Sequence, residues 1–163
     1  MKTQNVILLL GGNQGNVMQV LSSAIALIEK EAGPLTAMSA VYKTGAWGPV
    51  PQPDFLNLAI QIRTQLTPGL LMQRLLNIEK RFGRKRDVKY GPRTLDIDIL
   101  FFGDAVIHTE LLTIPHPEIQ NRRFALKPCA DIAAGKRHPV LNKTIGELLL
   151  VCADKLAVNE VKP

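Results

Sequence analysis

The sequence contains few cysteines and few aromatic residues. Of its 163 residues only two are cysteine, Cys129 and Cys152, and aromatic side chains make up 5%. Two cysteines without CxxC spacing exclude a disulfide-rich scaffold and a cysteine-based zinc or redox motif. We therefore expect a cytoplasmic protein in which both cysteines are buried as small apolar side chains.

Long apolar runs are also missing. Uninterrupted runs such as VILLL at residues 6–10 are far shorter than the roughly 20 residues that span a bilayer. The residues before VILLL do not have the layout of a cleavable signal, so we expect neither export nor membrane anchoring. Hydrophobic residues nevertheless make up 46% of the chain, which is typical of a folded protein with a sizeable core. We predict a single domain over residues 1–163.

Basic residues outnumber acidic ones and are unevenly distributed. The formal net charge of +6 predicts affinity for polyanions such as nucleotides, diphosphates or nucleic acid, but does not choose among them. Six basic residues are concentrated between positions 81 and 93: Arg81, Arg84, Lys85, Arg86, Lys89 and Arg93. A carboxylate pair, Asp96 and Asp98, follows directly, so the basic segment indicates a site for a negatively charged group beside two acids.

The periodicity of apolar residues predicts an α+β fold. Strands are expected at residues 6–10, 35–43, 55–63 and 95–102, and helices at 17–28 and 68–82. The order β-α-β-β-α-β predicts a ferredoxin-like sandwich with both helices on one face of an antiparallel sheet and the other face open. An extra C-terminal part should add a short hairpin (106–114), a partly helical stretch (123–134) and a helix from the capping box at Thr144 to Cys152.

The carboxylate pair lies in a strand whose side chains alternate. In residues 95–99 (LDIDI) the two-residue period places Asp96 and Asp98 on the open face, about 6.8 Å apart along the strand. Two carboxylates on a rigid strand suit Mg²⁺ that also binds the phosphates of a nucleotide. Taken alone, the pattern is equally compatible with incidental acids on a solvated face. The preceding GPRT favours the metal interpretation, because a stiff turn would place Arg93 beside the ions.

Phe55 and Asn57 share that face by the same alternation. An exposed aromatic beside an amide provides a stacking surface and hydrogen-bonding groups for a flat heterocycle. A lone phenylalanine at a strand edge more often packs against a loop, so this pattern by itself is a weak indication.

Two further segments are candidates for phosphate-binding loops. Gly12 and Gly15 supply only two of the three glycines of a dinucleotide fingerprint, and the chain has no GxxxxGK[ST] loop. A turn with Asn16 as helix cap accounts for that segment. His116 lies in a stiff IPHP loop shortly before Arg122. Both a phosphate contact and a structural role are open for this histidine.

Taken together, three segments resemble the 6-hydroxymethyl-7,8-dihydropterin pyrophosphokinases of folate biosynthesis. They are GAWGPVPQPDFLN at residues 45–57, GPRTLDIDI at 91–99 and LTIPH to NRRF at 112–124. The resemblance extends over nearly the whole chain. It implies a ferredoxin-like fold and transfer of the β,γ-diphosphate of ATP to the pterin hydroxymethyl group, releasing AMP.

The resemblance also implies residue roles. Two Mg²⁺ ions would be held by Asp96 and Asp98, and Arg84 and Arg93 would join this pair in catalysis, with Arg84 and Arg86 on a loop that closes over the phosphates. The pterin would be bound by Thr44, Phe55, Asn57 and Phe124. The co-substrate ATP would be bound by Glu79, Arg84, Arg86, Arg93, Thr113, His116 and Arg122. The chain departs from the family pattern at Gly45, Leu76, Leu111 and Pro117.

A nucleic-acid-binding domain is the alternative, because a basic α+β sandwich with an open sheet face is also the plan of RNA-recognition domains. Such domains carry aromatics on the central strands, and residues 6–10 contain none. We therefore predict a monomeric enzyme whose partners are ATP and the pterin, with neither nucleic acid nor membrane as partner.

Overall fold

The computed structural model describes residues 2–45, 48–83 and 94–162, and within them the chain has an α+β fold. Its elements are β1 (Gln4–Gly12), α1 (Val17–Glu31), β2 (Leu35–Met38), β3 (Tyr42–Thr44), β4 (Phe55–Thr64), α2 (Pro68–Arg81), β5 (Asp96–Phe102), β6 (Ile107–His108), β7 (Thr113–Ile114), α3 (Arg123–Ala133), α4 (Ile145–Val151) and β8 (Val158–Glu160), with a 3₁₀ turn at Ile119–Asn121. The predicted α+β class is confirmed.

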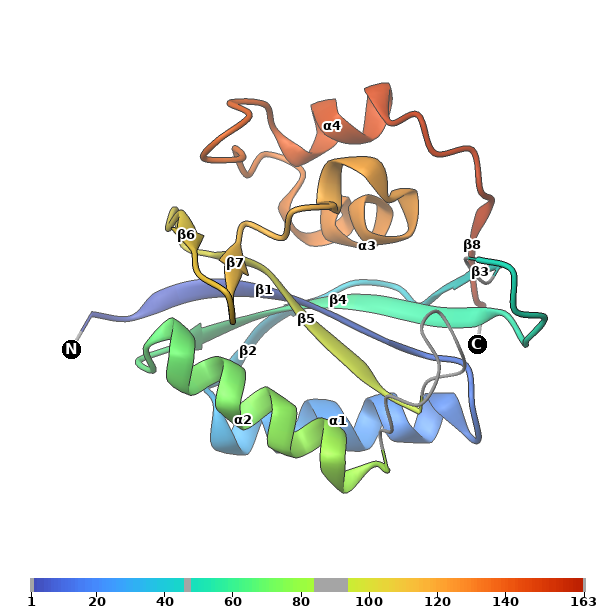
Figure 1. Ribbon diagram of the computed structural model, residues 1–163, viewed down its shortest axis with the longest axis horizontal. Coiled ribbons are helices and arrows are strands. Elements are labelled where there is room, and N and C mark those ends of the chain that lie inside the picture. The colour runs from blue at the N-terminus through green and yellow to red at the C-terminus, as the bar shows by residue number, and fades with distance from the viewer. Residues whose placement is uncertain (1, 46–47, 84–93, 163) are drawn as a thin grey trace.

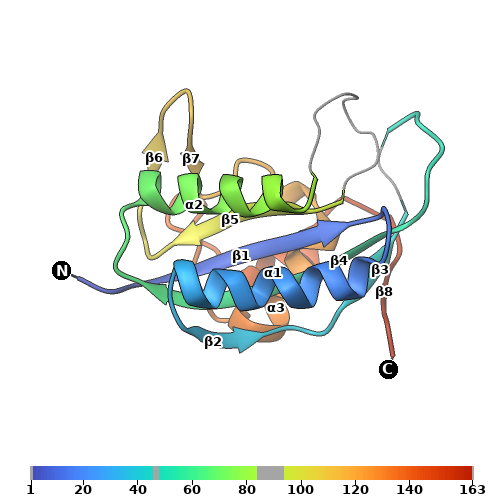
Figure 2. The ribbon, with the colours of Figure 1, turned by 90° about the horizontal axis from the view of Figure 1, so that it is seen from below.

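The main sheet has the order β5-β1-β4-β3-β8, with β2 also paired to β4, and its described pairs are antiparallel. Helices α1 and α2 lie side by side on one face (Figure 2). The strand expected at 35–43 is two strands, β2 and β3. Ser39 divides them because its Oγ accepts the N–H of Ala59 at 2.9 Å, a bond that a backbone carbonyl would otherwise make.

Three predicted helix starts are confirmed by their caps. The side chains of Asn16 and Thr67 accept the N–H groups of Gln19 and Leu70, both at 3.3 Å. Thr144 and Glu147 form the reciprocal capping box that opens α4. Each cap satisfies a backbone donor that the first helical turn cannot pair internally.

The second face of the sheet is covered, and the expectation of an open face was wrong. Helices α3 and α4 lie on it, opposite α1 and α2 (Figure 1). Ile7 and Leu9 of β1 pack there with Leu126 and Cys129 of α3. The sequence could not show this cover, because the apolar residues of α3 predict a buried helix face but not the surface against which it packs. Both cysteines are buried, as predicted.

A bulge in β5 increases the apolar surface under α3. Ile7 pairs with Phe101 while the next residue, Leu8, pairs with Ile99, so Leu100 is an extra residue in the ladder. Leu100 and Phe101 consequently both belong to the core beneath α3 and α4. No helix in the described ranges is long and apolar enough to cross a membrane.

His138 packs against the core beneath α3 and α4, and its protonation makes the stability of the protein depend on pH. Its buried ring contacts Phe101 edge to face, with ring centroids 5.6 Å apart, and its Nδ1 accepts the N–H groups of Val140 and Leu141 at 3.1 and 3.0 Å. Burial lowers the pKa of His138 below its ordinary 6.5, and the charge of Lys136 acts in the same direction. The folded protein therefore resists protonation of this ring.

We expect the free energy of unfolding to fall as the pH drops below 6.5, because the unfolded chain then binds a proton that the folded chain excludes. The slope for one such group is at most about 1.4 kcal/mol per pH unit. Urea unfolding at several pH values between 5 and 7.5 measures it. His138→Asn keeps an acceptor near the Nδ1 position and should flatten the slope, leaving the part that comes from His116. An unchanged slope in this variant would contradict the prediction.

Candidate functional site

Three residues form a row across the neighbouring strands β4, β1 and β5 of the sheet. Gly11 of β1 pairs with Asn57 of β4 on one side and with Asp96 of β5 on the other. Paired residues of neighbouring strands point to the same face, so the side chains of Asn57 and Asp96 flank Gly11. Strands lie about 4.8 Å apart, which separates the two side chains by about 10 Å. The register confirms the prediction that Asn57 and Asp96 share one face of the sheet.

Gly11 lies between Asn57 and Asp96 and has no side chain of its own. Its role was not predicted. A Cβ at this position would lie 2.2 Å from Oδ1 of Asn57 and 3.2 Å from the carbonyl oxygen of Leu56. Because Gly11 has no side chain, the carboxamide of Asn57 has room at its observed position. A glycine inside a buried strand is the signal that could have revealed it, because such glycines commonly mark a close approach.

Three of the four residues proposed to bind a heterocycle, Thr44, Phe55 and Asn57, lie together at one end of the sheet. Thr44 and Asn57 are buried, and Nδ2 of Asn57 donates to Oγ1 of Thr44 at 3.4 Å. Phe55 is the cross-strand partner of Thr44. Phe124 is the second residue of α3, and the guanidinium of Arg122 lies 5.7 Å from the centroid of its ring. Two neighbouring strands and the start of one helix therefore supply the four side chains.

Asn13 was also missed by the sequence reasoning. Its Nδ2 donates to Oε1 of Gln52 at 2.8 Å and to the carbonyl oxygen of Pro53 at 2.9 Å. These bonds tie the end of β1 to the chain that enters β4 just before Phe55. The local sequence around Asn13 does not predict these hydrogen bonds, because their acceptors are about 40 residues away in sequence.

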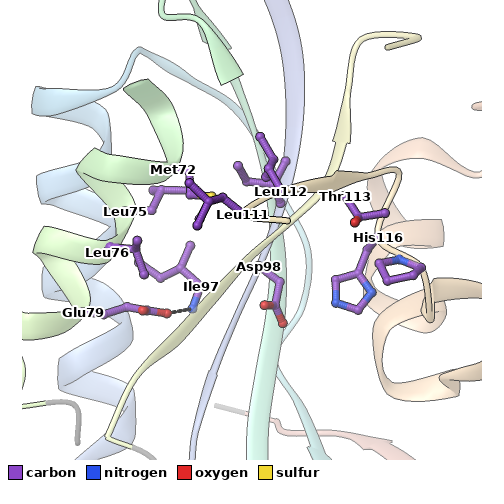
Figure 3. A pocket seen from close by; sticks show the side chains of 12 residues that line it. Met72, Leu75, Leu76, Glu79, Ile97, Asp98, Leu111, Leu112, Thr113 and His116 are labelled. Carbon is purple, nitrogen blue, oxygen red and sulfur yellow. Dashed lines mark hydrogen bonds between the residues drawn. The ribbon is translucent and has the colours of Figure 1, made fainter. Parts of the chain in front are cut away.

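A pocket of about 280 Å³ lies along the outer edge of β5, between α2 and the segment that follows β6 (Figure 3). Eight of its twelve described lining residues are apolar, and its polar residues are Glu79, Asp98, Thr113 and His116. The apolar residues are Met72, Leu75, Leu76, Ile97, Ile99, Leu111, Leu112 and Pro117. Three predicted ATP contacts and three of the four departures from the family pattern thus surround the same pocket.

Glu79 fixes the edge strand of this pocket. It is buried, and its Oε2 accepts the backbone N–H of Ile97 at 2.6 Å (Figure 3). Ile97 stands between Asp96 and Asp98, so this bond holds the backbone that carries both carboxylates. The ATP contact expected of Glu79 stays a prediction, whereas its bond to β5 is a structural role that the sequence did not reveal.

His116 faces the pocket from the other side. Its backbone N–H donates to the carbonyl of Leu100 at 3.0 Å, and its Nδ1 accepts the N–H of Glu118 at 3.1 Å. Burial lowers the pKa of His116, against the opposing effect of the Asp98 carboxylate. Burial therefore favours the neutral form of the ring, and Nε2 has no hydrogen-bond partner among the described residues.

The carboxylate pair fits Mg²⁺. Asp96 and Asp98 are half-buried on a rigid strand, and carboxylate oxygens are the ligands that this ion prefers. In residues 2–45, 48–83 and 94–162, no three His, Cys, Asp or Glu side chains gather into a metal cluster. Mg²⁺ commonly has one or two protein carboxylates, with water and substrate phosphates as its other ligands. Arg84, Arg86 and Arg93 lie outside the described residues.

An α+β sandwich with a carboxylate pair beside a pocket is compatible with the nucleotide-dependent transferases, the class to which the comparisons also point. The model of the 7,8-dihydro-6-hydroxymethylpterin-pyrophosphokinase (HPPK) family matches residues 7–134. The chain belongs to this family and is a pyrophosphokinase of folate biosynthesis, which confirms the prediction made from its motifs.

Proteins similar to the chain include two bacterial enzymes described as 2-amino-4-hydroxy-6-hydroxymethyldihydropteridine pyrophosphokinase. The one from Synechocystis is 46% identical over 86% of this chain and 72% of its own length. That from Bacillus subtilis is 42% identical over 76% and 74%. Among solved structures, wild-type HPPK-DHPS of Plasmodium falciparum with pteroate has a TM-score of 0.76 at 19% identity, over 91% of this chain and 44% of that one. The chain thus spans less than half of that protein, and the likeness shows the fold.

Proposed function

We propose that the pterin binds over the row of Asn57, Gly11 and Asp96, and that ATP binds in the pocket beside β5. The cross-strand register supports this assignment, because it sets a buried amide and a carboxylate on one face with only a glycine between them. The reaction is then transfer of the β,γ-diphosphate of ATP to the hydroxymethyl group of 6-hydroxymethyl-7,8-dihydropterin, with release of AMP. The hydroxymethyl group would point from Asn57 toward Asp96.

Polar side chains would hydrogen-bond to the edge of the pterin, and aromatic rings would contact its two faces. Asn57 and Thr44 offer an amide and a hydroxyl, the donors and acceptors that a pterin edge requires. Phe55 and Phe124 would stack on the two faces of the pterin ring. Flat heterocycles stack favourably on aromatic side chains. Burial of Thr44 and Asn57 keeps water from competing for these bonds.

ATP would lie with its base against the α2 side of the pocket and its phosphates toward Asp98. Leu76 lies on the α2 side, and Thr113 and His116 lie opposite it with Asp98 between (Figure 3). Nε2 of His116 can donate to a phosphate oxygen, since the other ring nitrogen is already paired. Arg84, Arg86, Arg93 and Arg122 would add positive charge for the triphosphate.

We assign two Mg²⁺ ions to Asp96 and Asp98. Bound Mg²⁺ neutralises phosphate charge and orients the group that is transferred. The chain's own contribution is to hold the two carboxylates on a strand that Glu79 fixes at Ile97. We further assign the core from β1 to β5 to the ferredoxin-like folds and treat residues 1–163 as one domain. The monomeric state and the cytoplasmic location stay predictions.

The activity is tested by following AMP formation. We expect AMP to form only when ATP, Mg²⁺ and 6-hydroxymethyl-7,8-dihydropterin are all present. Absence of AMP in the complete mixture, together with binding of RNA, would support the nucleic-acid-binding alternative instead.

The pterin site is tested by Phe55→Ala and Phe124→Ala. Each change should weaken pterin binding by about 1–3 kcal/mol, the range for a base stacked on an aromatic side chain. The dissociation constant of ATP should barely change, because the ATP pocket is lined by other residues. Isothermal titration calorimetry with each ligand measures both values. Weaker ATP binding with unchanged pterin binding would show that these rings lie outside the pterin site.

A further inference from the structure

The segment after α4 crosses from the start of α3 to the edge of the sheet. Asp154 lies at its beginning, and its Oδ2 accepts the backbone N–H of Arg123 at 3.0 Å. The other oxygen, Oδ1, accepts the N–H of Leu156 at 3.0 Å and so fixes the carboxylate within its own turn. Arg123 is the first residue of α3 and directly precedes Phe124. One carboxylate thus ties the C-terminal segment to the residue next to the proposed stacking ring.

The same segment then reaches the opposite wall of the proposed pterin site. Strand β8 pairs with β3, and Val158 is the partner of Thr44 (Figure 1). Leu156 lies beside Gly45, since a Cβ on that glycine would be 3.5 Å from Cδ1 of Leu156. Residues 154–160 therefore contact both the start of α3 and the end of β3.

The first turn of α3 depends on this carboxylate. Among the described residues, the side chain of the N-cap residue Arg122 makes no capping hydrogen bond to the helix. The first N–H groups of a helix have no partner within it, and a negative charge there also interacts favourably with the helix dipole. Asp154 supplies a hydrogen-bond acceptor and a negative charge to this helix start from a distant part of the sequence. Without it, the turn that carries Phe124 would lose an external hydrogen bond.

We propose that Asp154 is a positioning residue for the pterin site: it fixes the first turn of α3 and thereby holds Phe124 against the wall formed by Thr44. This inference rests on the assignment of Phe124 to the pterin. The segment lies beyond residues 7–134, the part that matches the family model. Positioning of the ring is thus contributed by residues outside the matched region.

Asp154→Ala should raise the dissociation constant of the pterin about fivefold to tenfold, as expected for loss of a helix cap. The dissociation constant of ATP should change less than about twofold, because Asp154 does not line the ATP pocket. Asp154→Asn keeps an acceptor oxygen and should recover most of the affinity. Should Asp154→Ala not fold, Leu156→Ala provides a second test, since it loosens the same segment and should weaken pterin binding in the same direction.

Thr144→Ala is the matched control, because it removes a cap of similar strength from α4 without contact to Arg123. It should leave pterin affinity unchanged. Equal losses in Asp154→Ala and Thr144→Ala would mean general destabilisation and would overturn the proposal. Hydrogen exchange of the two variants adds a direct readout, since only Asp154→Ala should speed exchange in the first turn of α3.

A double-mutant cycle with Phe124→Ala separates the positioning role from the site itself. If Asp154 acts through Phe124, adding Asp154→Ala to Phe124→Ala should change pterin affinity less than about twofold. Fully additive losses would overturn the positioning role. If Phe124→Ala alone leaves pterin affinity unchanged, the proposed pterin site is wrong and the positioning role falls with it. If only Phe124→Ala weakens pterin binding, the site stands and the positioning role is wrong.

Discussion

Replacing Asp96 or Asp98 by alanine is expected to lower kcat by about 10³-fold or more. Each carboxylate is assigned to hold Mg²⁺ against the triphosphate, and charge stabilisation by a bound metal contributes several kcal/mol to the transition state. A loss of about 4 kcal/mol corresponds to a factor of roughly 10³ in rate. The protein should stay folded, because both side chains are half-buried and lie on the opposite face of β5 from the buried Ile97 and Ile99.

Steady-state kinetics at saturating Mg²⁺ measure the effect, and circular dichroism checks the fold. Asp104→Ala is the matched control, since Asp104 is an exposed carboxylate near the end of the same strand whose described ion pair is with Lys136. Its turnover should equal that of the unmodified protein. A near-normal rate in either Asp96→Ala or Asp98→Ala would remove that residue from the metal site.

The alternation of side chains predicted the arrangement of the site more reliably than its surroundings. Leu56, Leu58 and Ile60 alternate strictly with polar or small residues, and this pattern sets Phe55 and Asn57 on the face shared with Asp96. The pattern is local, so it can be read from the sequence. The cover of that face by α3 and α4 depends on packing between segments far apart in the chain. That information is not contained in any local pattern, which explains why the open-face prediction was wrong.

Strand β8 and the bulge at Leu100 show two further limits. The sequence VNE at 158–160 is too short and too polar to predict a strand, and it forms one because the edge of β3 offers backbone partners. The bulge turns Leu100 and Phe101 to the same face, whereas alternation would separate them. In both cases the partner strand decides the conformation.

Residues whose role depends on a cross-strand partner were missed for the same reason. Gly11 and Asn13 belong to a segment that could be read as a simple turn, and their partners Asn57, Gln52 and Pro53 are known only from the register. Asp98 was found from the alternation of its strand and His116 from its place in a stiff loop, and the resemblance gave each of them a role. The geometry then added the contact of Glu79 with β5, which no motif describes.

Gly11 is the position where this dependence predicts a large effect. Gly11→Ala would place a Cβ 2.2 Å from Oδ1 of Asn57, so the carboxamide must leave its position. The nearby carbonyl oxygen of Leu56, at 3.2 Å, is backbone and cannot rotate away. The displaced amide would no longer meet the edge of a pterin bound as proposed. Forcing a group into such a packed site costs about 1–3 kcal/mol before the lost hydrogen bonds are counted.

We therefore expect Gly11→Ala to lower kcat/KM for the pterin by about 10²-fold or more, and Gly11→Val to lower it further. Gly69→Ala is the matched control, since a Cβ there has no described atom within 4 Å, and it should keep full activity. Because the severe clash, at 2.2 Å, is with Asn57, the variant that combines Gly11→Ala with Asn57→Ala should be little worse than Asn57→Ala alone. If the two losses multiply instead, Gly11 acts on the pterin independently of Asn57. Normal pterin kinetics in Gly11→Ala would place the substrate elsewhere than over the row of Asn57, Gly11 and Asp96.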